Sequence, residues 1–232
     1  MNAPLLPDQL HLGCGDFAPD GWLNTDGSWH VWLAQWPLLK KWAVWTGVVP
    51  RLHLEHPWPT TLLHLDLRGP LPFPDRTFAA VYASHVLEHL YRTEALALLR
   101  ELWRCCRPGG VVRMAVPDLA HAVADYQRGV IAPDAPGRSP ADTLLYRLHL
   151  RPAAPPGAQS RLRALYHAWL DFNSHKWLYD RDSLLALFRE AGFSQPEERA
   201  ILASRIPAID RIERADRISG GGTLIVEAAR PE

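Results

Sequence analysis

Residues 78–90 read FAAVYASHVLEHL, an apolar run that ends in a polar turn and a second apolar segment. The run Phe78–Ser84 is apolar almost throughout, which is typical of a strand buried on both faces of a parallel sheet. The residues after it contain His85, Glu88 and His89 in the order His-x-x-Glu-His, which one class of zinc protease also uses. The stretch therefore bears on both the fold class and the possibility of a bound metal.

Similar apolar segments recur on both sides of this strand and predict further strands. We expect them at Leu10–Leu12, Trp22–Asp26, Thr60–Leu67, 111–118, 199–206 and 223–229. Helical spacing predicts helices that begin near Ser84 or His85 and that cover Thr93–Arg107, Leu162–Trp169 and Leu184–Ala191. Residues 133–157 are rich in Pro, Ala and Gly and are expected to form a loop.

Strands that alternate with helices predict an α/β fold. We expect a single domain over residues 1–232, built on a doubly wound, Rossmann-like sheet of seven strands. Insertions at about 27–59 and 130–178 are expected to form a cap over the sheet.

Composition and charge argue against several classes of protein. The chain has 232 residues, with 25 basic and 25 acidic side chains, so no basic groove for nucleic acid is expected. Its three cysteines include no CxxC pair, which favours reduced thiols in the cytoplasm over a disulfide framework. The first residues, MNAPLLPDQL, lack the basic region of a signal peptide. No uncharged apolar run reaches the ~18 residues that a membrane-spanning helix needs.

Four features fall at the predicted carboxyl ends of the strands, where ligands bind in parallel sheets. Gly13 and Gly15 bracket a turn and allow the backbone to approach a ligand closely. An acid such as Asp26, at the end of the second strand, commonly accepts hydrogen bonds from ribose hydroxyls, and Asp66 could accept one from an exocyclic amine. Each of these residues is explained about equally well as a plain turn residue with no ligand. These three features together, in this order at strand ends, indicate a ligand that contains adenosine. The fourth feature is the segment SHVLEH, which begins at Ser84.

The segments that carry these features resemble a known family. LHLGCG (10–15), NTD (24–26), LDLRGPLPFPDRTFAAVYASHVLEHL (65–90) and ELWRCCRPGGVVRMAVPDL (101–119) are similar to class I S-adenosylmethionine-dependent methyltransferases of the type 11 group. The segment HKWLYDRDSLLALFREAGF (175–193) resembles a bacterial subgroup linked with cell-surface polysaccharide synthesis. The resemblance covers about residues 10–230.

The resemblance implies S-adenosylmethionine as the cofactor and assigns roles to the residues at the strand ends. Gly13, Cys14 and Gly15 would line the methionine part, and Asp26 would take the ribose. Asp66 and Leu67 would contact the adenine, and Ser84 and His85 would close the reactive end. The expected reaction is methyl transfer to a small-molecule or glycan-linked acceptor.

Two departures from the family pattern keep an alternative open. His11 stands where the first strand usually carries an acid, and Ala79 replaces the Asp of an FD pair. Only ten residues separate Gly15 from Asp26, too few for the usual crossover helix, but the polysaccharide-linked subgroup shares this shortened crossover. The alternative is a non-catalytic partner module of the same fold that binds the cofactor or a nucleotide. A metal hydrolase would need a further ligand and a long continuing helix. Neither is evident in the sequence, so no metal is expected, and Glu88 and His89 are interpreted as structural.

His85 is the best candidate for a catalytic base because it lies at the methyl end of the predicted site. His175 is a second candidate, with Tyr179 and Asp118 as weaker ones, on segments expected to overhang the pocket.

Seven of the ten tryptophans lie between Trp22 and Trp58. They could form a packed lid, an aromatic wall for a sugar or lipid acceptor, or a helix at a membrane surface. Pro37 interrupts the helical spacing of Trp29, Trp32 and Trp36. We therefore expect residues 29–58 to cover the acceptor side of the pocket. Peripheral contact with a membrane and the oligomeric state stay open.

Overall fold

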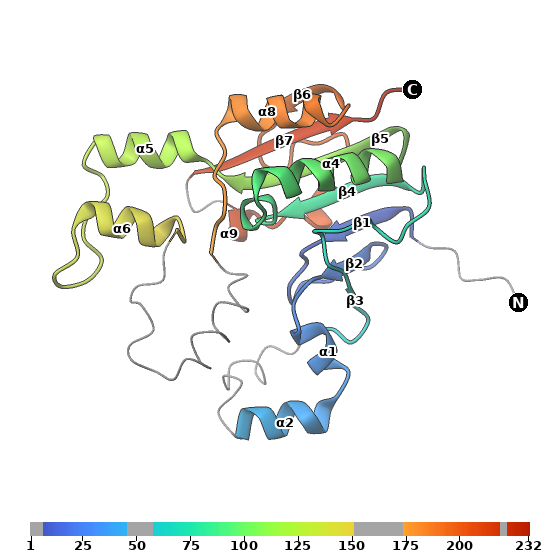
Figure 1. The fold of residues 1–232 in the computed structure, drawn as a ribbon, viewed down its shortest axis with the longest axis horizontal. Coiled ribbons are helices and arrows are strands. Elements are labelled where there is room, and N and C mark those ends of the chain that lie inside the picture. Colours follow the sequence, from blue (N-terminus) through green and yellow to red (C-terminus); the bar gives the residue numbers. More distant parts are fainter. Residues whose placement is uncertain (1–6, 46–57, 151–173, 219–221) are drawn as a thin grey trace, which may run out of the picture.

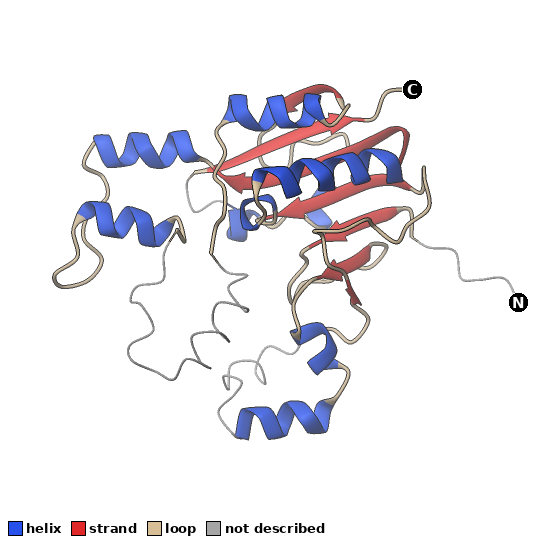
Figure 2. Ribbon diagram, viewed as in Figure 1, coloured by secondary structure: helices blue, strands red, loops and turns tan. Residues whose placement is uncertain are grey.

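The computed structural model describes residues 7–45, 58–150, 174–218 and 222–232. A seven-stranded mixed sheet in the order β3-β2-β1-β4-β5-β7-β6 runs through it (Figures 1 and 2). The strands are β1 (Gln9–Leu12), β2 (Leu23–Asp26), β3 (Leu63–His64), β4 (Phe78–Ser84), β5 (Cys106–Pro117), β6 (Ser194–Glu198) and β7 (Thr223–Ala229). β1 to β5 are parallel, and β7 is antiparallel to both of its neighbours. The predicted seven-stranded α/β fold is confirmed.

Two helices, α4 (Arg92–Cys105) and α8 (Arg181–Glu190), cover one face of the sheet (Figure 1). Alternate residues of β5, namely Val112, Met114 and Val116, face this layer and belong to the main core. α4 and α8 add buried leucines and Phe188 to the same cluster. The sheet is buried on this side because both helices turn an apolar face toward it.

The opposite face is covered by the connection from β6 to β7, which contains the 3-10 turn η2 (Ile209–Arg211) and the short helix α9 (Ala215–Ile218). Ile206, Ile209 and Ile212 of this connection pack against Trp22 and Tyr82. A doubly wound sheet usually carries the helix between its first two strands on such a face. Here the ten residues between Gly15 and Asp26 form no helix, and the later connection takes that place.

A buried ion-pair network fastens this connection to the sheet. Arg113 of β5 donates to both carboxylate oxygens of Glu213, over 2.8 and 2.7 Å. It also donates to the backbone carbonyls of Ala200 and Ala203, and it lies 3.4 Å from Glu227 of β7. The side chains of Arg113, Glu213 and Glu227 have no exposed surface.

Several predicted boundaries were wrong. The sixth strand is Ser194–Glu198 rather than 199–206, and it contains Pro196, which an edge strand paired on one side tolerates. The third strand keeps only Leu63–His64 of Thr60–Leu67, because it pairs with β2 alone. The Pro- and Gly-rich stretch 133–157 contains the helix α6 (Pro140–Arg147), whose capping box joins Ser139 and Asp142. The helix predicted around Leu162–Trp169 lies outside the described residues.

Pro37 separates the tryptophan-rich segment into two helices, as its position predicts. α1 (His30–Ala34) ends before it, and α2 (Pro37–Trp45) begins with it, where a missing backbone N–H does no harm. α5 (Leu119–Gln127) and α6 lie to one side of the sheet, at the left of Figure 1. Among the described residues, no helix combines the length and apolar character that crossing a membrane requires.

Candidate functional site

The turn after β1 presents its backbone to open space. Gly13 and Gly15 both adopt a left-handed conformation, with φ near +60°. A Cβ atom on Gly13 would lie 2.5 Å from Val86 Cγ2, so that position has no room for a side chain. A Cβ on Gly15 would meet nothing within 4 Å. A ligand can therefore approach the main chain directly at Gly15.

Asp26 at the end of β2 is fixed by this turn. Its Oδ2 accepts a hydrogen bond from the Gly15 amide over 2.9 Å, and its Oδ1 accepts one from the Ser28 amide over 2.8 Å. Each carboxylate oxygen can accept a further hydrogen bond. Asp26 is thus an oriented hydrogen-bond acceptor beside the glycine turn.

A cavity of ≈150 Å³ opens between the carboxyl ends of β1 and β4, where the strand order reverses. Gly13, Cys14, Ser84 and His85 were predicted at the site and line this cavity. Its volume is below the ~300–1,000 Å³ of a typical pocket, so it encloses only part of a cofactor-sized ligand.

Sequence reasoning missed the rest of the lining, which is His11, Phe17, Tyr82, Ile212, Arg214 and Ile218. Phe17 and Tyr82 adjoin the motifs and could have been found from them. Ile212, Arg214 and Ile218 belong to the β6–β7 connection, in which the sequence contains no motif that predicts a site. The Arg214 guanidinium lies over the Phe17 ring, 5.4 Å from its centroid, and it is the positively charged side chain of this lining.

Asp66 and Leu67 do not line the cavity. Asp66 accepts hydrogen bonds from the Arg68 side chain at both oxygens, over 2.9 and 2.7 Å, and this exposed pair lowers the pKa of Asp66. Leu67 is half-buried against the main core. Their assignment to the adenine stays a prediction.

His85 does not lie on a helix, so the prediction of a helix that begins near Ser84 or His85 was wrong. It adopts a left-handed conformation, with φ of 55°, and its amide donates to the Ala115 carbonyl. The helix predicted from here is only the 3-10 turn η1 (Leu87–His89), and α4 begins later, at Arg92. The turn lets His85 Nδ1 lie 2.9 Å from Glu88 Oε1 while the ring lines the cavity.

Glu88, His89 and His175 form a compact cluster behind His85. Each offers one metal-ligand atom, and these atoms lie within 4.8 Å of one another. The two histidine rings meet edge to face at 4.9 Å, and His175 Nε2 lies 4.0 Å from Glu88 Oε1. Burial lowers the pKa of His175 to about 4 and also lowers the pKa of His89. His175 was predicted as a catalytic candidate, but it does not line the cavity.

Asp118 and Tyr179 have structural surroundings. Asp118 caps α5, and its Oδ1 accepts from the amides of Ala120 and His121. Tyr179 is buried in the main core, and burial raises the pKa of its hydroxyl.

The tryptophan-rich hairpin (α1 and α2) packs beside the glycine turn through its first helix. Val31 of α1 is buried with Cys14 and Leu62, and Trp58 packs on the same cluster. The Trp32 ring lies 4.4 Å from that of His64. Beyond this contact the hairpin exposes large apolar side chains, including Trp36, Leu38 and Trp45.

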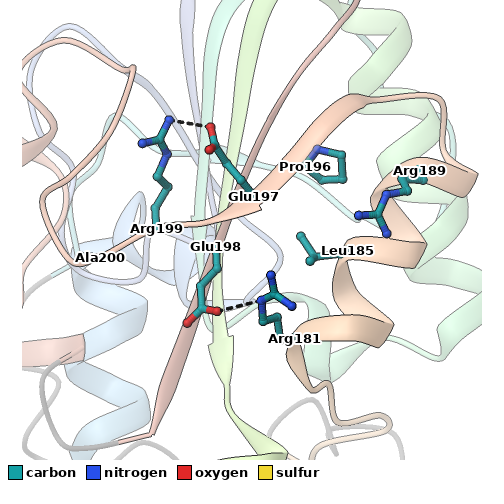
Figure 3. A pocket seen from close by; sticks show the side chains of 8 residues that line it. All are labelled: Arg181, Leu185, Arg189, Pro196, Glu197, Glu198, Arg199 and Ala200. Atoms are coloured by element: carbon teal, nitrogen blue, oxygen red, sulfur yellow. Dashed lines mark hydrogen bonds and ion pairs between the residues drawn. The ribbon is translucent and has the colours of Figure 1, made fainter.

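A larger hollow of ≈530 Å³ lies on the edge of the sheet between α8 and β6 (Figure 3). Two ion pairs, Arg181 with Glu198 and Arg199 with Glu197, hold its charged side chains to one another (Figure 3). None of the predicted site residues lines it.

Comparison with known proteins identifies a family for part of the chain. The family described as "Methyltransferase domain" matches residues 10–114, which run from β1 into β5. No curated protein matches the chain significantly in sequence.

Several solved structures have similar folds. An S-adenosylmethionine-dependent methyltransferase from Mesorhizobium loti is 20% identical, with 97% of this chain and 94% of that chain covered and a TM-score of 0.44. The YcgJ protein from Bacillus subtilis is 13% identical, with 98% and 93% covered and a TM-score of 0.49. The chain spans about half the length of some others, such as 50% of the carbon methyltransferase CurJ, at 13% identity, 100% coverage of this chain and a TM-score of 0.46.

The strand order, with its antiparallel β7, is typical of methyltransferases. Residues 10–114 therefore form a methyltransferase domain of the type 11 family, within the S-adenosylmethionine-dependent class I fold.

Proposed function

We propose that this chain methylates a small-molecule or glycan-linked acceptor at the carboxyl edge of its sheet, in the cytoplasm of a bacterium. The observation that carries the proposal is the cavity between β1 and β4, with the open glycine turn and the oriented Asp26 carboxylate beside it. The three cysteines are buried and form no disulfide, which is in keeping with a reducing compartment.

The residues present fit S-adenosylmethionine. The open space at Gly15 admits a ligand against the backbone, and the cavity beside it suits the methionine part. Arg214 would pair with the methionine carboxylate, and Asp26 would accept hydrogen bonds from the ribose hydroxyls. Asp66 and Leu67 would contact the adenine.

The sulfonium of the bound cofactor supplies an already activated methyl group. The protein then has to orient the acceptor and accept its proton. His85 is suited to this because it lines the cavity and holds Nδ1 against Glu88. If Nδ1 donates to the carboxylate, as the bond implies, Nε2 is left to accept a proton. Asp118, Tyr179 and His175 are less suited, because other contacts hold them.

Two features support the proposed acceptor class. Segment 175–193 resembles a polysaccharide-linked subgroup, and indole rings of the kind that the tryptophan-rich hairpin exposes commonly stack on sugars. The hairpin joins the glycine turn through Val31 and Cys14. We infer that the insertions at about 27–59 and 130–178 act as a cap on the acceptor side.

Calorimetric titration with S-adenosylmethionine and its demethylated product tests the cofactor site. Asp26→Ala should weaken binding by ~1–3 kcal/mol, because it removes charge-assisted hydrogen bonds to the ribose. Asp20→Ala, an exposed acid after the same turn, is the control and should bind normally. Unchanged affinity in Asp26→Ala would contradict the assignment.

Turnover against a panel of sugar and small hydroxyl acceptors tests the reaction. His85→Ala should lower the rate by at least ~100-fold while cofactor affinity stays close to wild type. Exposed His121 provides the control variant, His121→Ala. Tight cofactor binding without methylation of any acceptor would favour the non-catalytic partner module.

A further inference from the structure

Glu88 is a carboxylate in an unusual position. Its side chain has no exposed surface, and burying a charge without compensation is costly. Both ion pairs that it forms among the described residues are with histidines, His85 at 2.9 Å and His175 at 4.0 Å. His85 engages only Oε1, while Oε2 is buried and has no hydrogen-bond partner in the described part of the chain.

The neighbouring histidines have the same deficit. Nδ1 of His89 and Nδ1 of His175 are also buried, and neither has a hydrogen-bond partner within the described residues. Buried polar atoms are nearly always satisfied, so three orphaned atoms in one cluster require an explanation. All three are of the kinds that bind metal ions, two imidazole nitrogens and a carboxylate oxygen.

We propose that Glu88, His89 and His175 bind a divalent cation of the zinc class. Their ligand atoms lie within 4.8 Å of one another. Around zinc, with ligands at ~2.0–2.2 Å, such atoms are about 3.3 Å apart, so a contraction of at most about 1.5 Å closes the site. The ion would neutralise the buried carboxylate and bind one nitrogen of each imidazole ring.

The ligand set decides which ion is preferred. Imidazole with one carboxylate suits Zn²⁺ and other late transition metals, whereas Mg²⁺ and Ca²⁺ prefer sites made of oxygen atoms. Three protein ligands also leave a coordination position open, as in catalytic rather than structural zinc sites. His85 supports the carboxylate from the side of the cavity, since it contacts Oε1 and leaves Oε2 available.

The fold supplies the ligand that the sequence alone did not reveal. His175 lies far from the His-x-x-Glu-His motif in sequence, and its segment is held in place by two backbone hydrogen bonds. Lys176 and Trp177 both donate to the Glu88 carbonyl. The proposal replaces the expectation that this motif holds no metal, and it does not depend on methyl transfer.

The test uses the full chain with any affinity tag removed and residual metal stripped by a chelator. Zn²⁺ added alone should bind one equivalent per chain in calorimetry and raise the melting temperature, because it binds the folded state preferentially. Co²⁺ should give the visible absorption of a site with nitrogen and oxygen ligands. Mg²⁺ should do neither.

Two variants from different segments separate ligation from folding. Glu88→Gln and His175→Ala should each weaken Zn²⁺ binding by at least about 100-fold, a loss larger than changes to residues that only support the ligands cause. The control is His121→Ala, which alters an exposed histidine paired with Asp125 over 3.4 Å and should bind Zn²⁺ like the wild type.

The opposite results would overturn the proposal. One is that Zn²⁺ leaves the melting temperature of the wild-type chain unchanged. The other is that both variants still bind Zn²⁺ while His121→Ala loses binding. Circular dichroism of each stripped variant checks that it is folded. If Glu88→Gln does not fold, His89→Ala takes its place.

Discussion

Arg113 is the largest of the fully buried side chains in the described part of the molecule, and it illustrates how single residues hold this fold. Its guanidinium lies between Glu213 and Glu227 and donates to two carbonyls of the β6–β7 connection. The covering layer over that face of the sheet therefore depends on a charged residue as well as on apolar contacts.

Arg113→Met is expected to destabilise the protein by about 3–5 kcal/mol, because two buried carboxylates would lose their counter-ion. Arg68→Met is the matched control. Arg68 pairs with Asp66 at the surface, where such pairs contribute about 0–1 kcal/mol. Urea denaturation of both variants gives the comparison, and similar midpoints would contradict the role of the network.

Glu227 makes part of the stability depend on pH. Burial alone would raise the pKa of Glu227, but hydrogen bonds from Ser204 and Arg205 and the charge of Arg113 outweigh it, so its pKa is lowered in the folded protein. Because the pKa of Glu227 is lower in the folded state, its ionised carboxylate stabilises the fold at pH values above the unfolded pKa, near 4.5. This contribution to stability disappears as the pH falls through the folded pKa.

The wild-type chain should therefore lose unfolding free energy more steeply than Glu227→Gln as the pH falls below ~4.3–4.5, where the loss begins. Urea denaturation across this range measures both slopes. Equal slopes would show that Glu227 does not carry the effect.

At the scale of elements, the tryptophan-rich hairpin leaves several large apolar side chains exposed. Trp45 is 84% exposed, whereas Trp22 at the start of β2 is 8% exposed beneath the β6–β7 connection. Trp45→Ala should change the unfolding free energy by less than about 0.5 kcal/mol, and Trp22→Ala should cost about 3–5 kcal/mol. Thermal melts of both variants test this. A large loss in Trp45→Ala would indicate that the hairpin packs more closely than its exposure implies.

The structure of the same hairpin bears on a question that the sequence left open, namely whether this segment covers the pocket or contacts a membrane. Pro37 divides it into a five-residue and a nine-residue helix, which is a poor surface for continuous contact with lipid. Its fluorescence should therefore respond to cofactor or acceptor and stay unchanged with anionic liposomes. A blue shift with co-sedimentation on liposomes, and no response to cofactor, would identify a membrane contact instead.

At the scale of the whole molecule, the three thiols report on global unfolding. Cys14, Cys105 and Cys106 are all buried. Burial raises the pKa of Cys105 to about 11 and that of Cys106 to about 12. A thiol reagent at pH 8 should label neither Cys105 nor Cys106 until the protein unfolds, because access and the thiolate form are both suppressed. Labelling of these two much faster than unfolding would show that α4 and β5 separate locally.

The sequence by itself determined the fold class and predicted the edge of the sheet at which the candidate site lies. Apolar strands such as Phe78–Ser84 are local signals, and glycines or acids at strand ends follow from the way parallel strands end at one edge. Gly13, Asp26, Ser84 and His85 could therefore be proposed as site residues from local patterns alone. The methyltransferase domain could also be recognised from the sequence, because its motifs lie within one continuous segment, residues 10–114.

Only the tertiary structure decided the contacts between distant segments. Pattern reasoning placed the sixth strand at 199–206, because these residues look apolar in isolation. In the fold they instead cover the face of the sheet that a shortened crossover leaves bare, and Arg113 fixes them there. His175 likewise reaches Glu88 through backbone hydrogen bonds that no local spacing encodes. Short-range periodicity determines which elements form, whereas the pairing of buried charges depends on which surfaces the chain brings together.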